Sequence, residues 1–259
     1  MNFTARLQTQ AASGEKIAVL TCYDASFATL MEAADVDVLL VGDSLGMVLQ
    51  GAPDTLGVSM ADMCYHVRCV AAGACSTLII ADMPYASDSD PEQALENAWR
   101  LLEAGAHMVK LESDKTDATR HLTAHGIPVC AHLGFTPQSV RELGGYKVQG
   151  RDEAGAKKIL DDALALQQAG ATLLVLEMVP AALARLVTER LAIPTIGIGA
   201  GPDCSGQVLV LHDMLGIYPG KSPRFAHNFL RGAESVQEAL AAYVQAVKRR
   251  AFPATEHCF

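Results

Sequence analysis

The segment 101–112 reads LLEAGAHMVKLE, and the segment 166–177 reads LQQAGATLLVLE. In each segment a helical stretch ends at an Ala-Gly pair, and a short apolar run then ends in a glutamate seven residues after the glycine. A glycine is the usual residue just after a helix, and a short apolar run is typical of a buried strand. The repeat of helix end, loop, strand and acid predicts a parallel sheet built from successive βα units.

The same alternation of apolar runs and amphipathic stretches continues through the chain. Candidate strands fall at 17–22, 37–42, 77–81, 107–111, 127–131, 172–176 and 193–198, with an eighth within 207–217. Many are apolar throughout, as strands covered on both faces should be. We therefore predict the α/β class and a single (β/α)8 TIM barrel over residues 1–259. In such barrels the active site lies at the C-terminal ends of the strands.

The predicted helices carry local start signals. Ser59 and Asp62 have the spacing of a capping box, and Asp90 precedes Pro91 as an N-cap precedes a first-turn proline. A third helix is predicted over 152–169, with Gly170 as its stop. No linker or charge run interrupts the pattern, which favours one domain.

The amino-acid composition indicates which classes of molecule the protein can bind. The chain has 259 residues, is 50% hydrophobic and carries a formal net charge of −9. This acidity argues against nucleic acid or an anionic membrane as a partner and favours small-molecule substrates. The polar N-terminus lacks the hydrophobic region of a signal peptide, and no apolar run approaches the roughly 18 residues of a membrane span. We expect a cytoplasmic protein whose seven cysteines, with no C-x-x-C pair, are reduced and mainly buried.

Three acids close successive predicted strands and form a candidate metal site. Asp43, Asp82 and Glu112 follow the second, third and fourth apolar runs. Carboxylate oxygens suit magnesium, which leaves coordination positions for water and substrate. An α-keto acid can fill two of these positions, and the metal then polarises its carbonyl. Each acid taken alone can equally be the N-cap of the following helix.

Further polar residues are candidates for the same rim. Lys110 lies two residues before Glu112, so on a strand both side chains face the same way, and Lys110 can bind a carboxylate or stabilise an enolate. Glu177 ends the sixth apolar run, where burial raises a carboxyl pKa and suits a general base; a metal ligand or a structural acceptor is the alternative. His132 is a substrate-binding or acid–base group, or else holds a loop. Tyr23 has a weaker claim.

Two glycine-containing segments complete the pattern. The run IGIGAG at 196–201 suggests an anion-binding loop, although its glycines can equally serve a tight turn. The segment 136–150 is long, polar and flanked by glycines, which predicts a loop over the barrel mouth.

Six segments, in order across almost the whole chain, resemble the ketopantoate hydroxymethyltransferase family. They are VGDSLGM (41–47), ADMP (81–84), MVKLE (108–112), HLGFTPQ (132–138), GGYKVQG (144–150) and IGIGAG (196–201). The tail EHCF (256–259) resembles the family's ending. The chain departs from the family where glycines often stand, at Ser113-Asp114 and at Ala131.

The resemblance implies a magnesium-dependent enzyme of pantothenate biosynthesis, typically a homo-oligomeric decamer. It would transfer a hydroxymethyl group from 5,10-methylenetetrahydrofolate to 3-methyl-2-oxobutanoate through a magnesium-bound enolate, giving 2-dehydropantoate. The implied metal residues are Asp43, Asp82 and Glu112. The implied keto-acid residues are Asp43, Ser44, Asp82 and Lys110. Glu177 matches the base, and His132 and Tyr23 match further active-site positions.

Two other functions fit parts of the pattern. A magnesium-dependent lyase of the isocitrate lyase type would also need acids at strand ends, but it usually needs a catalytic cysteine loop. A barrel that serves only as a scaffold would normally lack a metal ligand or the base, and neither is missing here. No residue of the sequence indicates the folate site, since the single tryptophan, Trp99, falls on a predicted helix.

Overall fold

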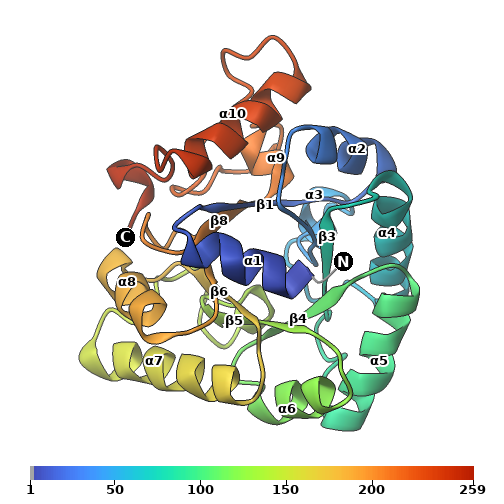
Figure 1. The fold of residues 1–259 in the computed structure, drawn as a ribbon, viewed down its shortest axis with the longest axis vertical. Helices are drawn as coiled ribbons and strands as arrows, with labels where there is room; N and C mark the ends of the chain where they lie inside the picture. Colours follow the sequence, from blue (N-terminus) through green and yellow to red (C-terminus); the bar gives the residue numbers. More distant parts are fainter. Residues whose placement is uncertain (1–2) are drawn as a thin grey trace.

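The computed structural model describes residues 3–259 and contains a closed barrel of eight parallel strands (Figure 1). The strands are β1 (Ile17–Thr21), β2 (Val38–Val41), β3 (Leu78–Asp82), β4 (Met108–Glu112), β5 (Val129–Gly134), β6 (Leu173–Glu177), β7 (Thr195–Ile198) and β8 (Gly206–Leu209). Each strand pairs with its neighbours in sequence, and β1 closes the ring against β8. The predicted α/β class and TIM barrel are confirmed. The single domain over 1–259 stays a prediction, and its first two residues lie outside the described part.

The strand ends differ slightly from the prediction. Asp82, Glu112 and Glu177 are the last residues of their strands instead of the first residues after them. His132 lies inside β5, and β8 begins one residue before the predicted range. The extension follows from pairing beyond the apolar run, because Glu112 aligns with His132 across β4 and β5. The polar side chains are therefore fixed by the strand ladder and not by flexible loops.

Helices surround most of the barrel. They are α1 (Phe3–Ala12), α2 (Ala25–Ala33), α3 (Leu45–Val48), α4 (Met60–Gly73), α5 (Pro91–Glu103), α6 (Thr116–Ala124), α7 (Glu153–Gln168), α8 (Ala181–Arg190), α9 (Leu211–Met214) and α10 (Val236–Lys248), with 3-10 turns η1 (Pro137–Ser139) and η2 (Thr255–His257). The predicted caps are confirmed. Ser59 and Asp62 form both bonds of a capping box before α4, and Asp90 and Asp152 accept from backbone amides at the starts of α5 and α7.

One connection of the barrel lacks a helix. Residues 199–205 link β7 directly to β8. Gly199 has φ +59, and a Cβ there would lie 2.9 Å from the Phe225 ring and 3.0 Å from the Phe259 ring. The glycines of 196–201 thus fit the tight-turn alternative, since aromatic side chains cover the turn where an anion would have to bind.

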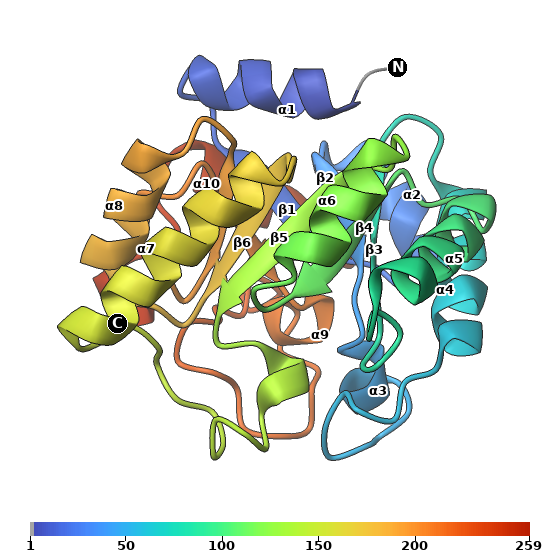
Figure 2. The ribbon, with the colours of Figure 1, turned by 90° about the horizontal axis from the view of Figure 1, so that it is seen from below.

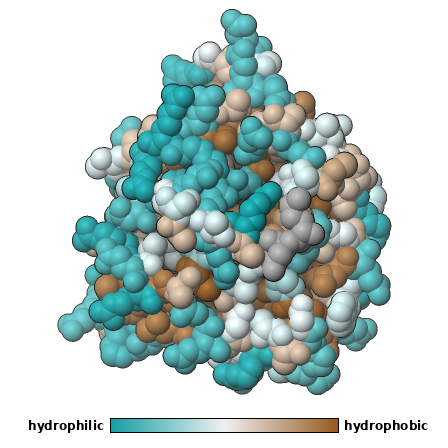
Figure 3. All heavy atoms as spheres, viewed as in Figure 1, coloured by the Kyte–Doolittle hydropathy of each residue, from teal (hydrophilic) through white to brown (hydrophobic). Residues whose placement is uncertain are grey.

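The two ends of the barrel differ in how they are covered. Helix α1 lies across the N-terminal end, while the loops after β2 and β5 extend from the opposite end (Figure 2). Leu7 of α1 is buried, and the ring of Phe3 lies 4.6 Å from the ring of His107. On the face crossed by α1, hydrophilic residues predominate and hydrophobic ones are scattered among them (Figure 3). Because α1 covers the N-terminal end, the C-terminal end of the barrel is the one open to a substrate.

Buried apolar residues form the interior of the barrel and the layer beneath its helices. A second, smaller cluster lies between β5–β6 and the helices α7 and α8, and it includes Leu174, Leu176 and Val187. All seven cysteines are free, and four of them are buried, as predicted. Among residues 3–259, no helix is long and apolar enough to cross a bilayer.

Candidate active site

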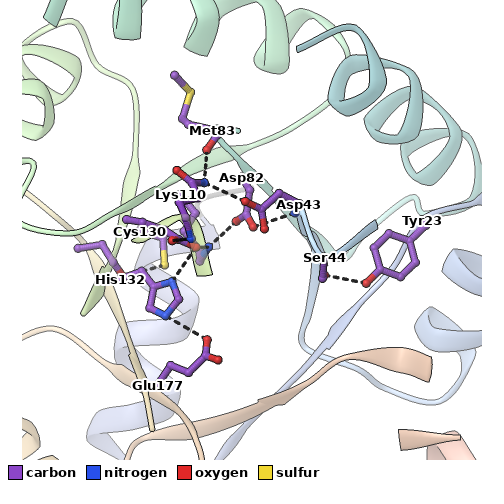
Figure 4. A network of polar contacts seen from close by, with 12 residues as sticks. Tyr23, Asp43, Ser44, Asp82, Met83, Lys110, Cys130, His132 and Glu177 are labelled. Carbon is purple, nitrogen blue, oxygen red and sulfur yellow. Dashed lines mark hydrogen bonds and ion pairs between the residues drawn. The ribbon is translucent and has the colours of Figure 1, made fainter. Parts of the chain in front are cut away.

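The barrel register brings the predicted polar residues together at the C-terminal ends of neighbouring strands (Figure 4). Asp82 aligns with Lys110 across β3 and β4, and Glu112 aligns with His132 across β4 and β5. Neighbours in a parallel ladder point to the same face, so these four side chains share the interior. All four are buried.

Lys110 is the buried cation of the cluster. Its Nζ lies 2.7 Å from Asp82 Oδ1 and 3.6 Å from Glu112 Oε1, and its side chain is 4% exposed. Burial alone would lower the pKa of Lys110, but the carboxylates of Asp82, Glu112 and Asp43 outweigh burial and raise it. The prediction that Lys110 and Glu112 face the same way is confirmed, and the ammonium stays charged.

The acids predicted as metal ligands do not cap helices. The N-cap positions of α5 and α6 belong to Asp90 and Lys115. Asp43 lies just after β2, and its backbone N–H donates to Asp82 Oδ2 at 3.0 Å. Burial and the charges of Glu112 and Asp82 raise the pKa of Asp43 well above its usual value. The helix-cap alternative therefore fails, and the two carboxylates instead contact other site residues, Asp82 with Lys110 and Asp43 with Gln138.

His132 lies between two glutamates. Its Nδ1 is 3.3 Å from Glu112 Oε1, and its Nε2 is 3.3 Å from Glu177 Oε2. At these distances His132 forms an ion pair with each glutamate, but neither contact has the angles of a hydrogen bond. Burial and Lys110 lower the pKa of His132, but the two glutamates prevail and raise it to about 9. The imidazole is thus a cation at neutral pH.

Glu177 is the most accessible acid of the cluster. Its side chain is 13% exposed, against 4% for Glu112. Burial raises the pKa of Glu177, and His132 opposes that rise only in part. Glu112 behaves differently, because His132 and Lys110 overcome its burial and lower its pKa. The carboxyl pKa values of the two glutamates that flank His132 are therefore shifted in opposite directions.

Gln138 belongs to the site but was not assigned a role from the sequence. Its Nε2 donates to Asp43 Oδ2 and to the Met83 carbonyl, each at 2.9 Å, and its backbone N–H donates to Glu112 Oε2 at 3.0 Å. One residue of the loop after β5 thus holds the ends of β2, β3 and β4. The segment 136–150 lies at the mouth as predicted, where Tyr146 reaches Met47 of α3.

We expect Gln138→Ala to weaken magnesium binding roughly tenfold, about the effect of losing a partner that orients a metal ligand. The reason is that Asp43 loses the donor that fixes its carboxylate. Isothermal titration with magnesium measures the change, with Gln149→Ala as the control because, within residues 3–259, its side-chain amide bonds only the nearby Lys147 carbonyl. Equal affinities in the two variants would contradict this role.

Tyr23 and Ser44 form a pair beside the acids. The Tyr23 hydroxyl lies 2.9 Å from Ser44 Oγ, and burial raises the pKa of Tyr23. Ser44 precedes α3, and its side chain makes no capping bond there. Its hydroxyl is therefore held by the buried Tyr23.

Asp213, in α9, has a pKa raised to about 6 by burial. Because the folded-state pKa lies above the unfolded value of about 3.9, the folded chain binds more protons between those values and loses stability as pH rises. We expect Asp213→Asn to raise the melting temperature at pH 8, with the gain vanishing near pH 4. Thermal unfolding of both proteins between pH 4 and pH 8 checks this expectation. An equal gain in melting temperature at both pH values would contradict the raised pKa of Asp213.

Two left-handed residues follow the two glutamates. Ser113 has φ +71 and Met178 has φ +46, a region that costs non-glycine residues energy. The Ser113 N–H donates to the His132 carbonyl, which holds the turn. A glycine at position 113 would fit this turn without strain.

The charges of the cluster suit a divalent cation. Asp43, Asp82, Glu112 and Glu177 supply four carboxyl groups against the two cations Lys110 and His132, an excess of two negative charges when all are ionised. The acceptors are oxygens, which magnesium prefers. Within residues 3–259 no three His, Cys, Asp or Glu side chains stand as a ready metal-binding group, and both Glu112 oxygens face protein donors. Both Asp82 oxygens likewise accept, from Lys110 and from the Asp43 N–H, so in the described part of the chain Asp43 Oδ1 is the oxygen of these three acids that has neither a hydrogen bond nor an ion pair to the protein.

The model of the ketopantoate hydroxymethyltransferase family matches residues 2–255. The chain belongs to this family. A 3-methyl-2-oxobutanoate hydroxymethyltransferase of Thiobacillus denitrificans is 61% identical over 249 residues, 95% of each chain. One of Azoarcus is 60% identical over 252 residues, 96% of this chain and 93% of the other. The chain is thus a member of an enzyme family of hydroxymethyltransferases, as predicted.

This member of the ketopantoate hydroxymethyltransferase family also has a fold similar to that of several solved structures. A putative phosphonomutase from Burkholderia cenocepacia has a TM-score of 0.66 at 17% identity, over 83% of this chain and 96% of the other. A 2,3-dimethylmalate lyase of the PEP mutase/isocitrate lyase superfamily has a TM-score of 0.56 at 18% sequence identity, and the match covers 76% of this chain and 72% of the other. At such identities the likeness concerns the barrel alone, so it gives the lyase alternative no support.

Proposed function

We propose that this protein transfers a hydroxymethyl group from 5,10-methylenetetrahydrofolate to 3-methyl-2-oxobutanoate, giving 2-dehydropantoate for pantothenate biosynthesis. The observation that carries the proposal is the buried cluster of acids around Lys110, with Glu177 and its raised carboxyl pKa beside it. The names of relatives about 60% identical support the same reaction. The proposed partners are small molecules and further copies of the chain.

Asp43 and Asp82 would hold a magnesium ion, with Glu112 at its edge. When bound, the metal supplies Lewis-acid polarisation of the keto acid's carbonyl. Lys110 would bind the acid's anionic oxygens and stabilise the enolate charge. The hydroxyl of Ser44, oriented by Tyr23, would donate to the acid's carboxylate. These groups would hold the substrate beside Glu177.

Glu177 would act as the base and remove the C3 proton, since a raised pKa brings its proton affinity nearer to neutral pH. His132 would stabilise the ionised base through its charge. The new bond forms between C3 and the methylene carbon as one of that carbon's two bonds to nitrogen opens. Water then replaces the second nitrogen, so tetrahydrofolate leaves with the proton taken from C3 and one proton of the water. C3 carries one hydrogen, so a single addition occurs.

The proposal is tested by incubating the protein with magnesium, 3-methyl-2-oxobutanoate and 13C-labelled methylenetetrahydrofolate. We expect the label to appear in the hydroxymethyl carbon of 2-dehydropantoate by NMR, and no label transfer with Asp82→Asn. Absence of product with the intact protein, together with cleavage of 2-hydroxy diacids, would identify a lyase instead.

A further inference from the structure

A cavity of about 430 Å³ opens at the C-terminal end of the barrel, outside the acid cluster. It lies between the loop after α3, the loop after β3 and the segment after β5, which reach the same end of the molecule (Figure 2). The lining residues used below are Asp54, Gly57, Tyr85, Gln138, Arg141 and Glu142. The volume lies within the range of about 300–1,000 Å³ that is typical of small-molecule sites.

The cavity adjoins the acid cluster through one side chain. Gln138 lines the cavity, and its Nε2 donates to Asp43 Oδ2 at 2.9 Å. A molecule in the cavity would therefore lie one side chain away from the proposed keto-acid site. This contiguity is what a second substrate needs in order to hand over a carbon atom.

The cavity is unsuited to the keto acid itself. Its wall carries the carboxylates of Asp54 and Glu142, which would repel a small anion. Its cation, Arg141, is 75% exposed and already pairs with Asp54 at 3.1 Å. The buried ammonium of Lys110 would stabilise the charge of a small anion far better than the exposed Arg141. The cavity is thus left for a larger molecule with its own hydrogen-bond donors.

The lining matches a flat heterocycle with a donor edge. The ring of Tyr85 is 49% exposed and is available to stack, as aromatic side chains do with heterocycles. Within residues 3–259, Glu142 has no hydrogen bond or ion pair, so its carboxylate can accept from an amino group and a ring N–H. Arg141 bonds Asp54 through Nη2, so although it cannot compensate a small buried anion, its other guanidinium N–H groups can donate to a carboxylate that stays at the cavity's solvent side.

We propose that this cavity binds the one-carbon carrier, a reduced pterin with a carboxylate-bearing tail. Tyr85 stacks on the pterin, Glu142 accepts from its donor edge, and the tail extends past Arg141. The assignment rests on the proposed function, because that reaction requires a second substrate at the same mouth.

Gly57 allows a test that leaves the acid cluster intact. Gly57 lines the cavity and a Cβ there would meet no atom within 4 Å, so Gly57→Phe adds a ring at the cavity wall without straining the fold. Glu142→Gln removes only the acceptor charge. Glu189→Gln, on the outer helix α8, is the matched control. Tetrahydrofolate is the probe, and its Kd is measured by isothermal titration in the presence of magnesium.

We expect Gly57→Phe and Glu142→Gln each to raise the Kd for tetrahydrofolate about tenfold or more, with the control unchanged. Deuterium exchange at C3 of 3-methyl-2-oxobutanoate should continue at the unmodified protein's rate in all three. An unchanged Kd in both cavity variants would overturn the proposal. Loss of exchange in Gly57→Phe would also overturn it, because the cavity would then belong to the keto acid. Weakened tetrahydrofolate binding in a protein that forms no 2-dehydropantoate would support the cavity while the proposed function fails.

Discussion

Glu177→Gln is expected to lower kcat by about 10²–10⁴, the usual contribution of a positioned general base. The amide keeps the shape of the side chain but has no proton affinity near neutral pH. The KM for the keto acid should change little, because Lys110 and Ser44 are the proposed groups that hold it. Steady-state kinetics measures both values.

The control for this variant is Glu153→Gln, an exposed glutamate in the first turn of α7. It should retain the unmodified kcat. If Glu177→Gln kept more than about a tenth of the activity, the base would have to be another group; His132, 3.3 Å away, could take that role only after losing the proton that Glu112 and Glu177 hold on it.

Lys110→Met is expected to lower the free energy of unfolding by about 3–5 kcal/mol when no divalent cation is present. The variant leaves Asp82 and Glu112 buried and facing each other without their shared cation. Urea denaturation at one fixed protein concentration measures the loss. Addition of magnesium should restore part of it, because a bound cation compensates the same carboxylates.

Lys157→Met is the matched control, since Lys157 is 73% exposed and pairs with Asp161 one helical turn away. Its loss should cost under about 1 kcal/mol. The double variant Lys110→Met/Asp82→Asn should be less destabilised than Lys110→Met alone, because it removes the unpaired charge. Equal costs for the two lysine variants would contradict the view that Lys110 balances the buried acids.

Local patterns made the barrel predictable. Strand positions followed from short apolar runs, and helix starts followed from residues such as Ser59 and Asp90, because both signals arise from nearby chain. The shared face of Lys110 and Glu112 followed from the two-residue period of a strand. These predictions needed no knowledge of which strands are neighbours beyond their order.

Other features depend on distant contacts and were not predictable. Gln138 is 95 positions from Asp43, and only the path of its loop brings the two together. The place of His132 between Glu112 and Glu177 depends on barrel register, which no single segment encodes. Within the helix-free link from β7 to β8, Gly199 lies against the ring of Phe259, a contact between residues far apart in the sequence.

The most direct test of the central claim is deuterium exchange at C3 of 3-methyl-2-oxobutanoate, followed by NMR with magnesium and without folate. The account predicts magnesium-dependent exchange in the unmodified protein and its loss in both Glu177→Gln and Asp82→Asn. Exchange that survives in Glu177→Gln, or that proceeds equally well without magnesium, would contradict it.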